Sequence, residues 1–234
     1  MGSITFGGTS IATADNYYGI NYSNTTAGQT YSINNNLIGS LTTPNSIQQT
    51  KTVTGTAFRG ILLANGAGTT NNITNNTIAN ITDLSTSTVN TVSVYGISNS
   101  GAGNYNFAGN TIRNLTNNCN VPSASFLLGG IFSTGAGINT YTQNNIYTLY
   151  ALGTGSGAQL VGGILAGGTT GGTVSKNKIF DFRHLGTGVL APAPLLLGFN
   201  VQSSRPYNIN NHMVSLTNGD PTDDPDYASM IKAV

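Results

Sequence analysis

The strongest candidate for acid–base chemistry in this sequence is a cluster of charged residues, Lys176, Lys178, Asp181, Arg183 and His184. A carboxylate beside lysine, arginine and histidine could abstract a proton from a sugar or bind a charged sugar. The alternative interpretation is a solvated outer strand whose charges keep the protein soluble. Because charged residues make up only 6% of the chain, we favour this alternative and expect no catalytic residue in the cluster.

Carboxylates are too scarce in this sequence for a glycosidase pair. Between positions 16 and 219 the chain has only Asp83 and Asp181, and it contains no glutamate. The two residues lie about three repeats apart, or roughly 14 Å at the spacing of stacked β-strands, which is too far for a glycosidase. The acidic stretch 220–226 matches no calcium-loop spacing and is interrupted by proline. We therefore expect neither a metal nor a cofactor.

Tyrosine side chains offer a different chemistry, because their rings can stack on a sugar or contact a protein partner. Four of them occupy positions that we expect to face outward: two precede a glycine, one follows an apolar residue of the asparagine frame, and one opens a loop. The predicted ligand surface consists of Tyr18, Tyr95, Tyr147, Tyr150, Lys178 and Asp181.

These candidates belong to a pattern that recurs six times along the chain. Each copy has a glycine followed by an apolar residue. The glycines are Gly19, Gly60, Gly96, Gly130, Gly163 and Gly198. In five copies an asparagine follows within the frame apolar-x-x-Asn-x-apolar-x-x-apolar. The asparagines, 40, 34, 34 and 33 positions apart, are Asn36, Asn76, Asn110, Asn144 and Asn177. A fixed period in this range is typical of stacked repeats.

The residue types favour β-strands over helix pairs as the repeating unit. The frame is built from Ile, Val, Phe, Tyr and Thr and is broken by Gly and Asn, which suits pleated backbone and turns. We therefore predict an all-β fold, a right-handed parallel β-helix of about six coils of about 34 residues, with three short strands in each coil. In the sixth copy either His212 or Asn211 takes the asparagine position.

The apolar spacing changes from two to three at each glycine and just past each asparagine, which predicts a corner at both places. We expect each asparagine to point inward, to tolerate left-handed backbone, and to hydrogen-bond to the next coil in a ladder. We expect each glycine to provide either a positive φ or a close backbone approach.

Length varies between copies in one place, ahead of each glycine strand, so we expect these loops to emerge on one side of the rod. The loops are residues 42–57, 82–93, 116–127, 150–160 and 183–195. Residues 1–15 resemble part of a coil, the repeats cover 16–218, and 219–234 predict a short helix or strand that caps the last coil.

Three segments carry a resemblance to a known family: Asn75 to Thr82, Gly109 to Thr116, and Tyr95 to Ser98. They resemble the right-handed parallel β-helix repeats of large secreted, adhesin-like surface proteins of Bacteroidetes-type bacteria. The resemblance covers about residues 15 to 218 and implies structural rather than catalytic residues at the matched positions. It is specific for the fold and weak for function, since β-helices host many activities.

From these observations we expect a non-enzymatic structural or adhesive rod at the cell surface or outside the cell. Its partner would be a glycan or a cell-surface protein. A polysaccharide-active enzyme and an end-to-end stacked filament are the alternatives. The net charge of +1 argues against nucleic acid as a partner, and no apolar run is long enough to span a membrane. The first residues lack a charged n-region followed by an apolar h-region, so we expect the signal peptide to lie outside this sequence.

Overall fold

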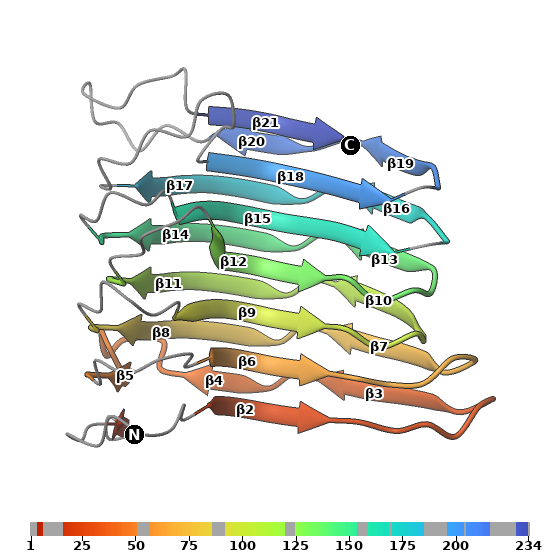
Figure 1. Ribbon diagram of the computed structural model, residues 1–234, viewed down its shortest axis with the longest axis horizontal. Coiled ribbons are helices and arrows are strands. Elements are labelled where there is room, and N and C mark those ends of the chain that lie inside the picture. The colour runs from red at the N-terminus through yellow and green to blue at the C-terminus, as the bar shows by residue number, and fades with distance from the viewer. Residues whose placement is uncertain are drawn as a thin grey trace.

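The computed structural model of the chain describes residues 4–6, 16–50, 57–85, 92–119, 125–153, 159–168, 170–184, 196–203, 205–215 and 228–233. Within these ranges every strand pairing is parallel and the secondary structure is all β. The strands stack coil upon coil from the N-terminal to the C-terminal end (Figure 1). The prediction of an all-β parallel β-helix is therefore confirmed.

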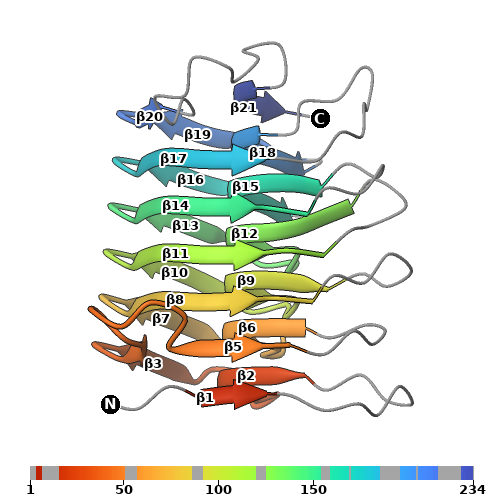
Figure 2. The ribbon, with the colours of Figure 1, turned by 90° about the vertical axis from the view of Figure 1, so that its left-hand side faces the viewer.

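Each coil passes through three sheets, in the order B, C and A, and Figure 2 shows the stacked strands of sheet A from the side. Sheet B contains β2 (Tyr17–Tyr22), β6 (Ala57–Leu63), β9 (Ser93–Asn99), β12 (Ser125–Ser133), β15 (Gln159–Gly168), β18 (Leu196–Ser203) and β21 (Ala228–Ala233). Sheet C contains β3 (Thr30–Asn34), β7 (Thr70–Thr74), β10 (Asn104–Ala108), β13 (Asn139–Thr142), β16 (Gly172–Ser175) and β19 (Tyr207–Asn210). Sheet A contains β1 (Ile4–Phe6), β4 (Leu37–Gly39), β5 (Ile47–Gln49), β8 (Thr77–Asp83), β11 (Thr111–Asn117), β14 (Asn145–Ala151), β17 (Lys178–His184) and β20 (Met213–Ser215).

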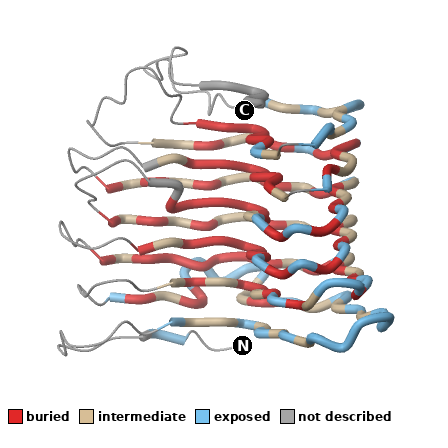
Figure 3. Tube along the Cα trace, turned by 45° about the vertical axis from the view of Figure 1, so that its right-hand side comes forward, coloured by how far each residue is buried: buried red, intermediate tan, exposed pale blue. Residues whose placement is uncertain are grey.

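About four coils are complete, rather than the six that the repeat count predicts. They run from β6 to β17, and their ladder asparagines are fully buried. The coil at either end is partial, because β4 and β20 have three residues each. Asn36 is only half-buried, and the last coil has no asparagine in the ladder position. Figure 3 shows the resulting difference in burial between the middle coils and the N-terminal coil.

A continuous asparagine ladder links the coils, as predicted. The side-chain amide of each of the first four asparagines donates to Oδ1 of the asparagine in the next coil, at 2.9 Å for Asn36 to Asn76 and 3.0 Å for Asn110 to Asn144. The same Oδ1 atoms also accept the backbone N–H of the preceding ladder residue. His212 continues the ladder: its Nδ1 accepts the N–H of Asn177 at 3.4 Å and its Nε2 contacts the Val174 carbonyl at 3.0 Å. His212 and not Asn211 therefore takes the sixth position.

The left-handed backbone lies one residue before each ladder asparagine, which corrects the expectation that the asparagine itself adopts it. Residues with positive φ at this corner include Asn75, Gln143 and Lys176. The chain turns there from sheet C into sheet A. The ladder asparagine can then point inward with ordinary backbone geometry, because its neighbour makes the turn.

The predicted corner glycines lie inside the strands of sheet B and not at a corner. Gly96 is in the middle of β9, and a Cβ there would stand 2.6 Å from Ile112 Cγ2 and 2.8 Å from the Gly130 carbonyl oxygen. Gly60, Gly130 and Gly163 have equivalent contacts. Close approach between sheets A and B therefore requires these glycines, and none of these four has a positive φ. The spacing of three between apolar residues at each glycine therefore indicates a bend within a strand of sheet B, and not a corner.

The two ends of the described chain add single strands to the stack. β1 pairs with β5 below the first complete coil, and β21 pairs with β18 above the last one. The segment 228–233 is therefore a strand, one of the two predicted alternatives.

Most of the variable loops, namely 51–56, 86–91, 120–124, 154–158 and 185–195, lie outside the described residues. The strand ends from which they leave stack above one another at the boundary between sheets A and B.

Candidate functional site

Asp181 lies on the outer face of sheet A, at a point where strand β17 bulges. Its φ is 58°, and the residue below it, Thr148, has a φ of 56°. The pairing of β14 with β17 skips both residues, going from Tyr147 with Phe180 to Leu149 with Phe182. The same left-handed bulge recurs at Asn80 and Asn114 in the coils below, so it belongs to the repeat. In this coil it places a β-branched residue, Thr148, in a strained conformation.

The Asp181 carboxylate is held by two hydroxyl groups of the coil below. Thr148 Oγ1 donates to Oδ2 at 2.6 Å. The Tyr150 hydroxyl lies 2.9 Å from Oδ1 and 3.0 Å from Oδ2. A carboxylate can accept about four hydrogen bonds, so it keeps capacity for a ligand. Partial burial, and then the hydrogen bond to Asp181 and its charge, raise the pKa of Tyr150, which stays a protonated donor at neutral pH.

Two stacked aromatic rings lie on the same face beside the carboxylate. The Tyr147 and Phe180 rings are 4.9 Å apart between centroids and nearly parallel, at 4°. Both side chains are half-buried. We call Tyr147, Thr148, Tyr150, Phe180 and Asp181 the Asp181 cluster. Thr148 and Phe180 were missed by the sequence analysis, although their positions one period from Asp181 and Tyr147 could have indicated them.

Of the charged residues around Asp181, Arg183 lies near enough to the cluster for its charge to lower the pKa of Tyr150, against the larger effects of burial and of Asp181. Lys178 is exposed and pairs with Asn145, and Arg183 pairs with Tyr150, so both lie on the outer face. His184 alternates to the opposite side of the strand, where burial lowers its pKa. Lys176 lies at the corner before β17. Lys178, Asp181 and Arg183 therefore share the outer face of β17, whereas His184 and Lys176 lie elsewhere.

Tyr95 is not available as an exposed ring, although it is on the outer face of sheet B. Only 5% of it is exposed. The Arg59 guanidinium lies 4.1 Å from the centre of the Tyr95 ring, and the Phe132 ring stacks on it at 4.5 Å and 9°. Burial raises the pKa of Tyr95 to about 12, against an opposing effect of Arg59. Tyr18 is half-buried in register with Arg59, on a different face from the Asp181 cluster.

The second carboxylate of the repeat region lies inside the stack. Asp83 is fully buried at the end of β8, where it accepts hydrogen bonds from Ser85 and Gln49. It and Asp181 therefore lie on opposite sides of sheet A, three coils apart, and cannot act as a pair.

Among the described residues no group of three histidine, cysteine, aspartate or glutamate side chains could hold a metal ion. No helix in the described ranges could cross a membrane.

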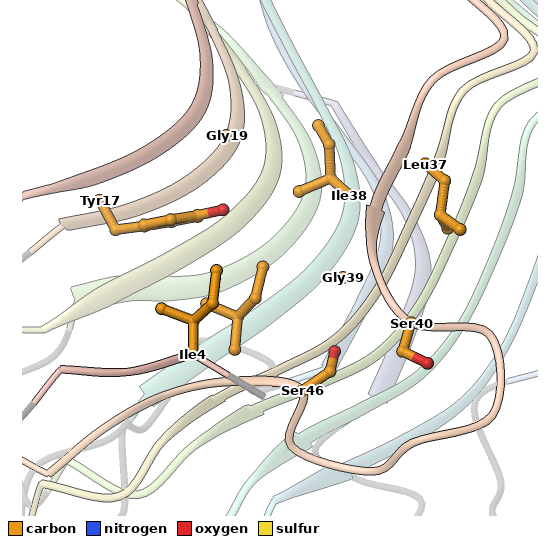
Figure 4. A pocket seen from close by; sticks show the side chains of 9 residues that line it. Ile4, Tyr17, Gly19, Leu37, Ile38, Gly39, Ser40 and Ser46 are labelled. Atoms are coloured by element: carbon orange, nitrogen blue, oxygen red, sulfur yellow. The ribbon is translucent and has the colours of Figure 1, made fainter. Parts of the chain in front are cut away.

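A separate apolar pocket of about 180 Å³ opens at the N-terminal end of the stack (Figure 4). Tyr17, Ile38 and Ile47 contribute to its walls. Ile4 and Leu37, which are 49% and 44% exposed, also line the pocket. The pocket therefore exposes the apolar interior between sheets A and B.

No family model, no curated protein and no solved structure matches this chain. The resemblance to adhesin-like surface proteins therefore stays a prediction.

Proposed function

We propose that this chain is a non-enzymatic structural and adhesive rod, a right-handed parallel β-helix of a secreted or cell-surface protein that binds glycan through the Asp181 cluster. The hand follows from the strong preference of parallel crossover connections for the right-handed sense. The observation that carries the binding proposal is a hydrogen-bonded carboxylate beside two stacked rings on one outer face.

The ladder supports the structural part of this proposal. Four consecutive asparagine pairs connect five coils through side-chain hydrogen bonds, in addition to the backbone pairing of three sheets. Buried amide networks of this kind rigidify the elements that they connect. Such a stack is suited to act as a stiff spacer that displays its outer faces.

The Asp181 cluster supports the adhesive part because its groups match the two surfaces of a sugar ring. The stacked Tyr147 and Phe180 rings offer an apolar platform for the C–H face of a sugar. The Asp181 carboxylate, fixed by Thr148 and Tyr150, can accept hydrogen bonds from sugar hydroxyls. Its preorganisation lowers the entropy lost on binding.

The test is binding of the whole chain to an array of neutral and uronate-containing glycans. Tyr147→Ala and Asp181→Asn should each weaken binding at least tenfold. Tyr18→Ala is the matched control, since it removes a half-buried tyrosine from another face, and it should bind like the wild type. Equal binding by all four proteins, or no binding by the wild type, would contradict the adhesive proposal.

The same glycans distinguish the enzyme alternative. Release of unsaturated products or reducing ends, abolished by Lys178→Ala or Asp181→Ala, would identify a polysaccharide-active β-helix and replace the adhesive proposal.

The apolar pocket at the N-terminal end favours a second candidate, end-to-end stacking of copies into a filament. The pocket presents the exposed apolar side chains of Ile4 and Leu37 to another chain, and a head-to-tail contact that does not close propagates. Sedimentation over a concentration series tests this candidate: species that lengthen with concentration, and shorten in Leu37→Asp, support it. A monomer at every concentration contradicts it.

A further inference from the structure

The outer face of sheet C is an uncharged surface of hydroxyl and amide groups. Six parallel strands form it in continuous register, from β3 to β19. Its central row of outward residues is Ser32, Asn72, Asn106, Thr140, Thr173 and Asn208. The row on one side of it is Asn34, Thr74, Ala108, Thr142, Ser175 and Asn210. None of these residues is charged, and in the described chain Lys176 and Arg205 lie only at the flanking corners.

Hydrogen bonds between coils hold two amides of the central row, Asn72 and Asn106, and that of Asn104 beside it. Thr140 Oγ1 donates to Asn106 Oδ1 at 3.1 Å, and Asn106 Nδ2 lies 3.4 Å from Asn72 Oδ1. The carbonyl oxygen of the Asn104 side chain accepts the N–H of Ile138 at 2.9 Å. These side chains are therefore held in one orientation, and groups that are already ordered lose less entropy on binding.

A hollow of about 230 Å³ lies in this face, bordered by Thr70, Asn104, Asn106, Ile138 and Thr140. Ile138 is 49% exposed there, an apolar side chain surrounded by amides and hydroxyls. This combination matches a sugar ring, which has C–H groups on its face and hydroxyls around its edge. An amide offers both a donor and an acceptor to such hydroxyls. A uronate or sulfated sugar would find no cation among these groups to balance its charge.

We propose that the outer face of sheet C binds an uncharged polysaccharide, with one sugar unit seated in the hollow beside Ile138 and the chain extending over the neighbouring amide and hydroxyl rows. This surface is separate from the Asp181 cluster and does not depend on it. The hollow and the projecting Ile138 interrupt the flatness that an ice-binding face would need, so a polysaccharide fits the surface better than ice does.

The experiment measures retention of the whole chain on insoluble cellulose and chitin, and its migration in gels containing soluble mannan or β-glucan. Thr140→Lys places a charge at the hollow and should lower affinity at least tenfold. Ile138→Ser removes the apolar group and should weaken binding without affecting the fold, since the side chain is half exposed. The matched control is Thr111→Lys on sheet A, in the row that Lys178 already occupies. Melting curves establish that all variants are folded.

Binding to at least one neutral polysaccharide that is lost in Thr140→Lys and Ile138→Ser, and kept in Thr111→Lys, supports the proposal. Failure of the wild type to bind any of them overturns it, as does equal weakening by Thr111→Lys. Incorporation of the wild type into slowly growing ice, abolished by Thr140→Lys, would overturn it in favour of ice. Loss of binding in Asp181→Asn alone would assign the glycan to the Asp181 cluster instead.

Discussion

Asp83 is a single carboxylate enclosed in the coil stack, where ionisation is unfavourable. Burial raises its pKa from 3.8 to about 6, against the opposing effect of hydrogen bonds from Ser85 and Gln49. One coil above, Asn117 occupies the same register and its Oδ1 accepts the N–H of Cys119 at 2.9 Å. Asp83 Oδ1 accepts the N–H of Ser85 at 3.0 Å in the same way. A neutral amide therefore already fits this interior position.

We predict that Asp83→Asn stabilises the protein at neutral pH. The folded state binds the Asp83 proton more tightly than the unfolded state, so the free energy of unfolding decreases as pH rises through the window from 3.8 to about 6. This pKa shift corresponds to about 3 kcal/mol. We expect the free energy of unfolding of the variant to exceed that of the wild type by this amount above about pH 6. Urea unfolding at pH 4, 5, 6 and 7 would measure the difference between variant and wild type.

The converse control is Asn117→Asp, which adds a second buried carboxylate at the equivalent position. It should destabilise the protein progressively as pH rises over the same range. A constant difference between Asp83→Asn and the wild type at all four pH values would show that the Asp83 carboxylate is not buried in this way.

For single residues, the sequence could predict only which side chains point inward, because the repeat period alone determines this. The inward position of Asn76 and Asn110 follows from a repeated register, and both are fully buried. The environment of Tyr95 did not follow, because its burial depends on Arg59 and Phe132, which lie one coil below and one coil above. The repeat pattern therefore predicts that a side chain lies on the outer face, but not whether side chains of the neighbouring coils cover it.

The ladder acts at the scale of strands, because each asparagine joins the corner of one coil to the coils on both sides. Asn110 donates to the Ile73 carbonyl at 2.7 Å and to Asn144, and its Oδ1 accepts two N–H groups of Asn76. Asn36 donates to Asn76 and Asn34 from a half-buried end. The two positions therefore differ in how many buried groups depend on them.

We predict that Asn110→Ala lowers the free energy of unfolding by about 3 kcal/mol, because buried donors and acceptors on both neighbouring coils lose their partners. Asn36→Ala is the control and should cost under about 1 kcal/mol, since water can replace its bonds. Chemical denaturation of both variants measures the difference. Similar losses would mean that the ladder does not connect the interior coils more strongly than the end.

The three sheets and their registers could be predicted from apolar spacing, but the corners could not. A spacing of three interrupts alternation both at a corner and at a bend or bulge within a strand. Gly96 and Asn114 are of the second kind, since β9 and β11 continue through them. The true corner at Asn75 carries a left-handed residue but no distinct apolar signal. Backbone geometry, rather than residue type, separates these cases.

Across the whole molecule, each coil contacts mainly its neighbours, so stability should vary along the stack. The complete coils have buried ladder bonds on both sides, whereas the last coil is tied by His212, whose Nδ1 lies 3.4 Å from the Asn177 nitrogen. The Phe199 ring packs against His212 at 4.3 Å. Burial lowers the pKa of His212. Its neutral form is favoured in the fold, and protonation would place an N–H against the N–H of Asn177.

We predict that hydrogen exchange, corrected for intrinsic rates, is slowest in β8, β11 and β14 and faster in β19 and β20. Because the folded-state pKa of His212 lies below its unfolded value, its contribution is present above about pH 6.5 and is lost as pH falls below that value. Protection of β19 should therefore decrease between pH 7.5 and pH 5.5. His212→Asn should restore the amide ladder, slow exchange in β19 and remove this pH dependence, while β11 serves as the internal control. Uniform protection along all coils would show that the stack unfolds as one unit and that the last coil is not its weak end.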